Sequence, residues 1–164
     1  MLLSNRRKFL TLLATPLALS ACGFTPIYGD ESPAKQMHGR IALGEFRGRN
    51  GFILREQLET NLGLATNATH MLDVNININR KGLAISRGGA ITRYNLTGNA
   101  SFTITQINGG VVHRSSVTAF TAYNATASAY ATRVSEQDAY RRLVETLADR
   151  ITTSMAISAE DWLT

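Results

Sequence analysis

The segment Leu72–Asn79 alternates strictly between apolar and polar residues, LDVNININ. Leucine, valine and isoleucine occupy the even positions, and aspartate and asparagine occupy the odd positions. Because successive side chains of a β-strand point to opposite faces, this pattern predicts a strand with one buried and one solvated face. A helical period of 3.6 residues would scatter the same apolar side chains around the axis. The chain is therefore expected to contain a sheet that is covered on one side.

Other extended segments flank this strand. A short excursion is expected at Arg80–Gly82, and glycine-containing turns are expected at Arg87–Gly89 and Asn108–Gly110, where positive φ angles are tolerated. The remaining predicted extended segments are Arg40–Phe46, Leu83–Ser86, Ile91–Gln106 and Val111–Tyr123.

Two segments carry helical periodicity. Phe52–Leu64 places a leucine at every fourth position, after Asn50 as a candidate N-cap. A second helix is predicted after Ser135–Asp138, which has the pattern of a capping box with Asp as its fourth residue. Its apolar stripe consists of Tyr140, Leu143, Val144, Leu147, Ala148, Ile151 and Met155.

The element order is strand, helix, several antiparallel strands and helix. This order predicts an α+β fold, a two-layer sandwich in which a mostly antiparallel sheet of about four strands carries both helices on one face. The other face is then exposed or available to a partner. Residues 38–164 are expected to form a single domain.

The N-terminal region has the features of an export signal. Arg6–Lys8 precede an apolar run, and Leu19–Cys22 reads LSAC, which resembles a bacterial lipobox and contains the only cysteine. We expect residues 1–21 to be a lipoprotein signal peptide, Cys22 to be acylated, and residues 22–37 to form a lipid-anchored tether. The alternative is an ordinary signal peptide with an incidental cysteine. Export through the general or the twin-arginine route stays open.

The charge of the chain does not indicate nucleic-acid binding. The chain has 17 basic and 12 acidic residues, and removal of the predicted signal peptide takes away three of the basic residues. The remaining balance is close to neutral, whereas a nucleic-acid-binding surface needs a concentrated basic stripe.

The sequence lacks the patterns of an active site. His38, His70 and His113 lie far apart and have no partner at metal-ligand spacing. No nucleophile elbow or phosphate-binding loop is present, and Cys22 is unavailable if it is acylated. We therefore expect a protein that is not an enzyme and uses no cofactor or metal.

One group of charged residues could bind a ligand. Arg80, Lys81, Arg87 and Arg93 lie within fourteen residues, with no acidic residue between them, and Arg133 could join them from a neighbouring loop. These cations either form a solvated strand edge that discourages aggregation or bind an anion such as a lipid headgroup.

Several segments resemble one family in sequence and in order. They are CGFTPIYG at 22–29, RGG at 87–89, YNL at 94–96, Tyr123-Asn124, Tyr130-Ala131 and Asp138-Ala139. The chain resembles the lipopolysaccharide-assembly lipoproteins called LptE, in the form seen in alphaproteobacteria.

This resemblance implies a non-enzymatic plug inside the outer-membrane β-barrel LptD, which helps the barrel assemble and helps deliver lipopolysaccharide to the outer leaflet. It places the protein at the outer membrane, held by its N-terminal lipid, on the periplasmic side and in the barrel lumen. Arg87 matches a basic position associated with the glycolipid, and a second such position falls on Thr132, next to Arg133. The alternative is a free periplasm-facing lipoprotein that binds a small ligand or peptidoglycan.

Overall fold

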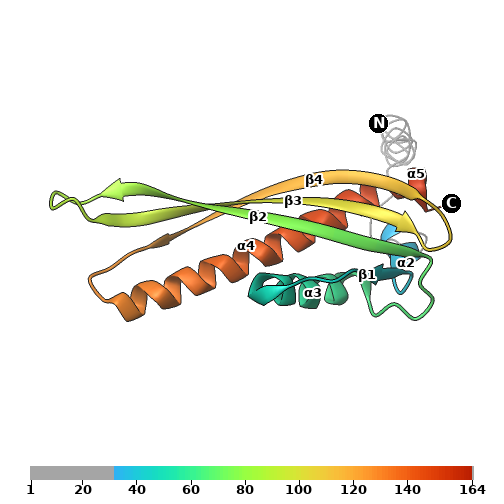
Figure 1. The fold of residues 1–164 in the computed structure, drawn as a ribbon, viewed down its shortest axis with the longest axis horizontal. Coiled ribbons are helices and arrows are strands. Elements are labelled where there is room, and N and C mark those ends of the chain that lie inside the picture. Colours follow the sequence, from blue (N-terminus) through green and yellow to red (C-terminus); the bar gives the residue numbers. More distant parts are fainter. Residues whose placement is uncertain (1–31, 164) are drawn as a thin grey trace, which may run out of the picture.

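The computed structural model describes residues 32–163, and the fold is an elongated two-layer α+β sandwich (Figure 1). The predicted signal peptide and Cys22 lie outside the described residues. The strands run in the spatial order β1-β2-β3-β4. The elements are α2 (Pro33–Met37), β1 (Ile41–Leu43), α3 (Gly48–Leu62), β2 (His70–Ile85), β3 (Ile91–Gln106), β4 (Val111–Asn124), α4 (Ala129–Ile157) and α5 (Ala159–Trp162).

Three long antiparallel strands make up most of the sheet. In the centre of the β2–β3 pair Asn77 lies opposite Asn99, and β3 pairs with β4 along most of its length. The short strand β1 runs parallel to β2. The sheet is thus mixed but mostly antiparallel, and the predicted fold class is confirmed.

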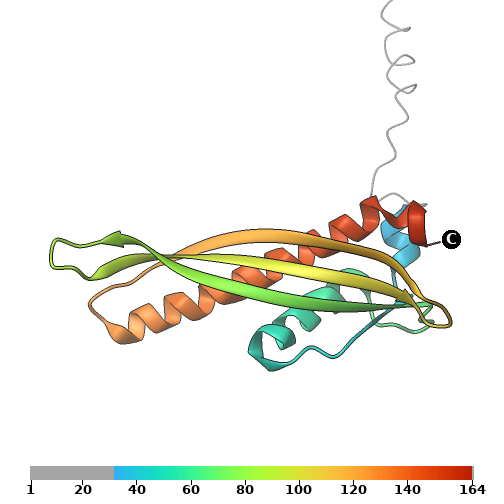
Figure 2. The ribbon, with the colours of Figure 1, turned by 45° about the horizontal axis from the view of Figure 1, so that its top comes forward.

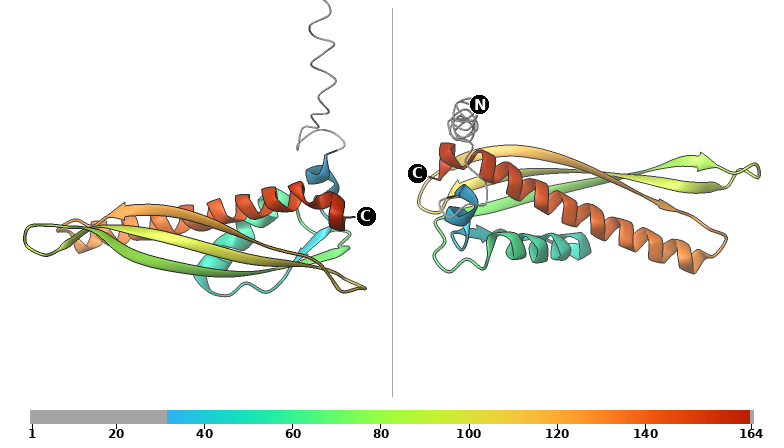
Figure 3. Two further views of the ribbon diagram at one scale, coloured as in Figure 1. Left: turned by 90° about the horizontal axis from the view of Figure 1, so that it is seen from above. Right: turned by 180° about the vertical axis from the view of Figure 1, so that it is seen from behind.

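The alternation of β2 decides which face of the sheet is buried. Leu72 is fully buried, Val74 and Ile76 are half-buried, and the intervening polar residues are exposed. The long helix α4 packs on β3 and β4, and α3 packs beside α4 (Figures 2 and 3). Both main helices therefore cover the same face, as the sequence predicted.

The predicted stripe of α4 forms the centre of the core. Leu143, Leu147 and Ile151 are almost fully buried. Gly98 on β3 lets the helix approach the sheet, since a Cβ added there would lie 2.8 Å from Cδ1 of Leu147. The helix and the sheet can pack this closely because glycine has no side chain at this contact.

Both helices begin earlier than the sequence predicted. The N-cap of α3 is Arg47, without a side-chain cap, so the expected cap at Asn50 is wrong. The N-cap of α4 is Ser128, whose hydroxyl accepts from the N–H of Ala131 at 3.3 Å. The capping box predicted at Ser135 is therefore helix interior. Because Ser128 caps α4 at an earlier position, no second helix N-terminus forms at Ser135.

The β2–β3 hairpin is longer than expected. The predicted excursion at Arg80–Gly82 is absent, because β2 continues to Ile85 with register shifts between Gly82 and Ile85. A bulge of this kind lets a strand continue past an irregularity while increasing its twist. The turn predicted at Arg87–Gly89 is confirmed, with Gly89 at φ +83°. The tip of this hairpin projects at one end of the molecule (Figure 1).

The opposite end of the molecule holds the N-terminal helix. Pro33–Met37, the last part of the predicted tether, forms α2, which packs against α4. Met37 is fully buried in the core. The folded part of the described chain thus includes residues that the proline-rich composition assigned to the tether. Within residues 32–163, no helix combines the length and hydropathy that crossing a bilayer requires.

Candidate functional site at the hairpin end

The structure brings the five predicted basic residues to one end of the molecule. Arg80 and Lys81 lie on β2, Arg87 lies in the turn, and Arg93 lies on β3. Arg133 lies in the first turns of α4, which begins at the same end (Figures 1 and 3). The five residues do not have the same surroundings, however.

Arg80 is engaged within the fold. Its Nη1 lies 2.7 Å from Oε1 of Glu136 on α4, and it donates to the hydroxyl of Tyr123 at 3.3 Å. Its guanidinium also lies over the Tyr94 ring, 5.0 Å from the centroid. The hydrogen bond to the Tyr123 hydroxyl raises the pKa of Arg80 further above its usual value. We conclude that Arg80 joins the hairpin to α4 and is the least available of the five for a ligand.

The two tyrosines around Arg80 form part of the same cluster. The rings of Tyr94 and Tyr123 are stacked, with centroids 5.1 Å apart. Burial is the main cause that raises the pKa of the Tyr123 hydroxyl above its usual value. This hydroxyl therefore stays protonated and accepts the bond from Arg80.

The other four basic residues are exposed. Within residues 32–163 neither an ion pair nor a side-chain hydrogen bond engages Lys81, Arg87, Arg93 or Arg133. Lys81 pairs with Asn95, two residues from Arg93. Because residues two apart on a strand share a face, Lys81 and Arg93 lie as diagonal neighbours on the open face of the sheet.

Exposed apolar side chains lie at the same end of the molecule as these cations, and the sequence analysis did not predict them. Leu83, Ile85 and Ile91 near the hairpin tip are exposed, and so are Tyr130 and Val134 on the first turns of α4. The signal in the sequence was the pair Leu83 and Ile85, two positions apart beside the cations. We call the exposed residues of the hairpin the hairpin-end patch: Lys81, Leu83, Ile85, Arg87, Ile91 and Arg93. Tyr130, Arg133 and Val134 lie at the same end on α4, which covers the face of the sheet opposite to Lys81 and Arg93. The patch combines positive charge with exposed apolar area, which a simple solvated edge would lack.

The middle of the open sheet face is polar and uncharged. Asn77, Asn99 and Thr118 form one row across three strands, and the Thr118 hydroxyl donates to Oδ1 of Asn99 at 2.7 Å. The neighbouring row consists of Asn75, Ser101 and Ser116. A surface of this kind forms hydrogen bonds with a polar partner without the cost of desolvating charges.

The three histidines lie apart from one another. His70 is buried and packs edge-on against Trp162, with ring centroids 5.4 Å apart. Burial lowers the pKa of His70 below its usual value. His113 lies near Ser158, and His38 lies against Gly63. In the part of the chain that the structure describes, histidine, cysteine, aspartate and glutamate side chains form no group that could hold a metal ion.

Comparison with known proteins identifies a family. Residues 39–155 match the family described as LptE, lipopolysaccharide-assembly. The match spans most of the chain. It includes the three long strands, the whole of α3, and α4 apart from its last two residues. It also identifies a non-enzymatic assembly family, in agreement with the sequence prediction. No curated protein matches the chain.

Solved structures show the same fold. A Caulobacter crescentus protein described as a lipoprotein aligns with a TM-score of 0.64 at 23% identity, over 78% of this chain and 96% of its own. Rare lipoprotein B from Shewanella oneidensis aligns with a TM-score of 0.59 at 17% identity, over 76% and 98%. A minor lipoprotein from Acinetobacter baumannii aligns with a TM-score of 0.55 at 19% identity, over 74% and 94%.

Proposed function

Since this chain belongs to the LptE family of lipopolysaccharide-assembly proteins, we propose that it plugs and helps assemble the LptD β-barrel of the outer membrane. In this role it takes part in transport of lipopolysaccharide to the outer leaflet. We further propose that Cys22 carries the lipid that anchors it on the periplasmic side, and that the chain is of the alphaproteobacterial form. The partner and the anchor follow from the family resemblance and from the lipobox.

The hairpin-end patch is the observation that carries this proposal. Lipopolysaccharide combines phosphate groups with acyl chains, so a protein surface that binds it needs cations beside apolar side chains. Lys81, Arg87 and Arg93 supply charges that no internal carboxylate neutralises within the described residues. Leu83 and Ile85 supply exposed apolar area on the same hairpin. Arginine in particular forms paired hydrogen bonds with phosphate oxygens.

The length of the molecule supports the same assignment. The 29 residues of α4 span about 43 Å at 1.5 Å per residue. A bilayer with its headgroup regions is about 40–45 Å thick. The N-terminal helix α2 lies at the end opposite the hairpin tip (Figure 1). An anchor near α2 in the periplasmic leaflet would allow the patch to reach the level of the outer leaflet.

The open sheet face suits a barrel lumen. Its rows of asparagine, serine and threonine could bind a polar wall through hydrogen bonds, with few charges to desolvate. The interface of a plug with its barrel is expected to be large and permanent.

A pull-down from detergent-solubilised outer membranes tests this proposal. The full chain, tagged at its C-terminus, should recover a large heat-modifiable β-barrel in about equal amounts, and the untagged chain serves as control. A stable monomer recovered without any barrel would contradict the plug and favour the free periplasm-facing lipoprotein.

A further inference from the structure

The outer edge of β2 is paired only at its beginning. The parallel strand β1 pairs with His70, Met71 and Leu72, and the N–H of Gly44 then donates to the Leu72 carbonyl at 2.9 Å. After this bond the chain turns away to form α3. Beyond Leu72, β2 has no neighbouring strand on this side among the described residues.

The hydrogen bonds at the start of β2 show which backbone groups face this edge. The N–H of Ile107 donates to the Thr69 carbonyl on the β3 side at 3.0 Å, whereas the Leu72 carbonyl accepts from Gly44 on the β1 side. Backbone groups of an antiparallel pair alternate between the two sides. The N–H and C=O groups of Val74, Ile76 and Ile78 therefore point to the open edge, and no other backbone group of residues 32–163 bonds to them.

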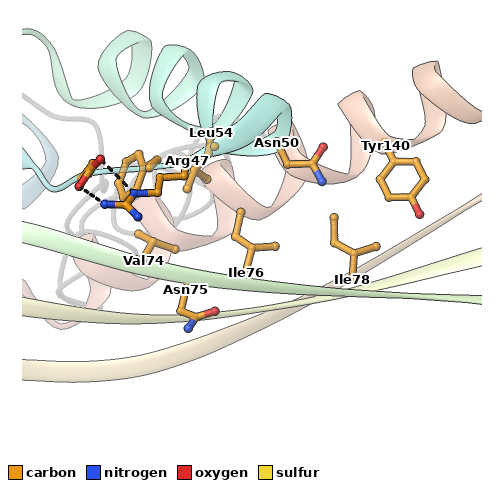
Figure 4. Close-up of a pocket in the computed structure, with 11 residues that line it drawn as sticks. Arg47, Asn50, Leu54, Val74, Asn75, Ile76, Ile78 and Tyr140 are labelled. Atoms are coloured by element: carbon orange, nitrogen blue, oxygen red, sulfur yellow. Dashed lines mark hydrogen bonds and ion pairs between the residues drawn. The ribbon is translucent and has the colours of Figure 1, made fainter.

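A groove lies beside this edge. Its volume is about 540 Å³, and its walls come from the start of α3, from β2 and from Tyr140 on α4 (Figure 4). The side chains of Val74, Ile76 and Ile78 line it and are only half-buried. The groove thus has apolar side chains on its floor and unpaired backbone groups along its rim.

The segment that leads from β1 into α3 holds the groove open. Arg55 donates to the Gly44 carbonyl, and its guanidinium lies over the Phe46 ring at 5.3 Å from the centroid. A Cβ at Gly51 would lie 2.8 Å from the Phe46 carbonyl carbon, so α3 and this segment are in close contact. Contacts within the fold thus fix the position of this wall of the groove.

We infer that this edge binds an extended polypeptide segment of a partner protein, which adds to the sheet as a strand that continues the line of β1. Only a chain in β conformation supplies donors and acceptors at the spacing of Val74, Ile76 and Ile78. An apolar residue at every second position of the segment would face the groove, and the intervening residues would face the side of Asn75 and Asn77. The inference is independent of the glycolipid contact at the hairpin-end patch.

Two features of the edge favour such an occupant. From Asp73 to Asn79 the strand has no lysine, proline or bulge, which are the usual protections of an exposed edge, and basic residues begin only at Arg80. A second copy of this chain fits less well, because its α3 would enter the helix layer that α3 already occupies beside this edge. A single strand brings no helix of its own.

The opposite edge of the sheet provides a comparison. On β4 the N–H of Ala125 donates to the Thr92 carbonyl, so the groups of Ser116 and Thr118 point outward by the same alternation. Arg150 of α4 donates to the Thr118 carbonyl and occupies part of that edge. Substitutions on β4 can therefore serve as matched controls.

The test uses the mature chain in detergent and a short synthetic peptide in which valine and threonine alternate. The peptide should bind, and amide exchange at Val74, Ile76 and Ile78 should slow by about tenfold or more, with no change on β4. Ile76→Pro removes an outward N–H while sparing the bonds to β3, and should abolish binding. Ser116→Pro makes the same change on the β4 edge and should leave binding intact.

A second measurement keeps the test valid if Ile76→Pro does not fold. The same peptide, N-methylated on the amides of one edge, should lose its affinity for the unmodified chain. Equal binding of a peptide with the same composition but its valines in one block would overturn the inference. Absence of binding to the folded chain would also overturn the inference. So would slower amide exchange at these positions when the protein is concentrated without peptide, because a second copy of the chain would then be the occupant.

Discussion

Arg80 on β2 and Glu136 on α4 form an ion pair at 2.7 Å across 56 residues of sequence. This pair ties the projecting hairpin to the start of the long helix. Arg80 is thus engaged on the face that α4 covers, whereas the side chain of its neighbour Lys81 points to the other face of the sheet.

Loss of this pair should loosen the hairpin with a modest cost in stability. The side chains are 48% and 29% exposed, so solvent weakens the attraction, and we expect Arg80→Met to reduce the free energy of unfolding by about 0.5–1 kcal/mol. A double-mutant cycle with Glu136→Gln, measured by urea denaturation, isolates the pair. The Arg47–Glu45 pair, with both side chains largely exposed, should give a smaller coupling. Equal couplings for the two pairs would contradict this expectation.

The hairpin-end patch should bind lipopolysaccharide through its free cations. Replacing both Lys81 and Arg93 by glutamate should weaken binding by about tenfold or more, because charge-assisted bonds to phosphate are lost and repulsion is introduced. Arg87→Asp should act in the same direction. Binding can be measured with fluorescent lipopolysaccharide at fixed salt. Arg49→Glu, an exposed change on α3, is the matched control. If it weakens binding as much as the patch variants, net charge rather than the patch is responsible.

Gly98→Ala should destabilise the core. The new methyl group would lie 2.8 Å from Cδ1 of Leu147 and 3.3 Å from Leu143, so these leucine side chains or the helix that carries them must shift, at a cost of about 1–3 kcal/mol. Thermal unfolding measures this loss. Gly88→Ala in the hairpin turn is the control, because a Cβ there meets only the Ser86 hydroxyl at 3.9 Å. Similar melting temperatures for the two variants would show that the helix–sheet contact accommodates the added methyl group with little loss of stability.

Buried His70 should make stability depend on pH. Burial lowers its pKa in the folded chain, so below the usual value of about 6.5 the unfolded chain binds more protons than the folded chain. Stability is therefore complete above this pH and falls as the pH decreases toward the folded pKa. His70→Gln cannot titrate and should lose this part of the slope between pH 7 and 5, as measured by urea denaturation. An unchanged slope would assign the pH dependence to other groups.

Cys22→Ala should abolish lipid attachment. The thiol is the acylation site of a lipobox, so the intact mass of the wild-type mature protein should exceed that of the unmodified chain by the mass of its acyl groups. The variant should lack this increment and should no longer fractionate with membranes. Acyl chains on the variant would refute the assignment of Cys22.

The sequence predicted the elements whose pattern repeats over many residues. The strict alternation at Leu72–Asn79 and the apolar stripe of α4 gave the correct element types and the correct buried faces. Ile91–Gln106 even gave the correct ends of β3. Helix starts were less accurate, because residues that can cap a helix, such as Asn50 and Ser135, occur more often than helices begin.

The candidate site was predicted in part. Clustering in sequence predicted the basic residues of the hairpin, since neighbours on a hairpin stay neighbours in the fold. It could not separate Arg80, which pairs with Glu136, from Lys81, which is free of such a partner within the described chain. Tyr130 and Val134 lie at the same end of the molecule as the patch only because α4 begins there.

The sequence alone therefore determined the period of each element and which of its faces is apolar, because both follow from residues only a few positions apart. The tertiary structure decided what depends on residues far apart in the chain. It placed β1 parallel to the start of β2 and left the edge beside Val74 unpaired. It also set Glu136 against Arg80, since an ion pair or a strand pairing depends on distances that only the packing of α4 on the sheet fixes.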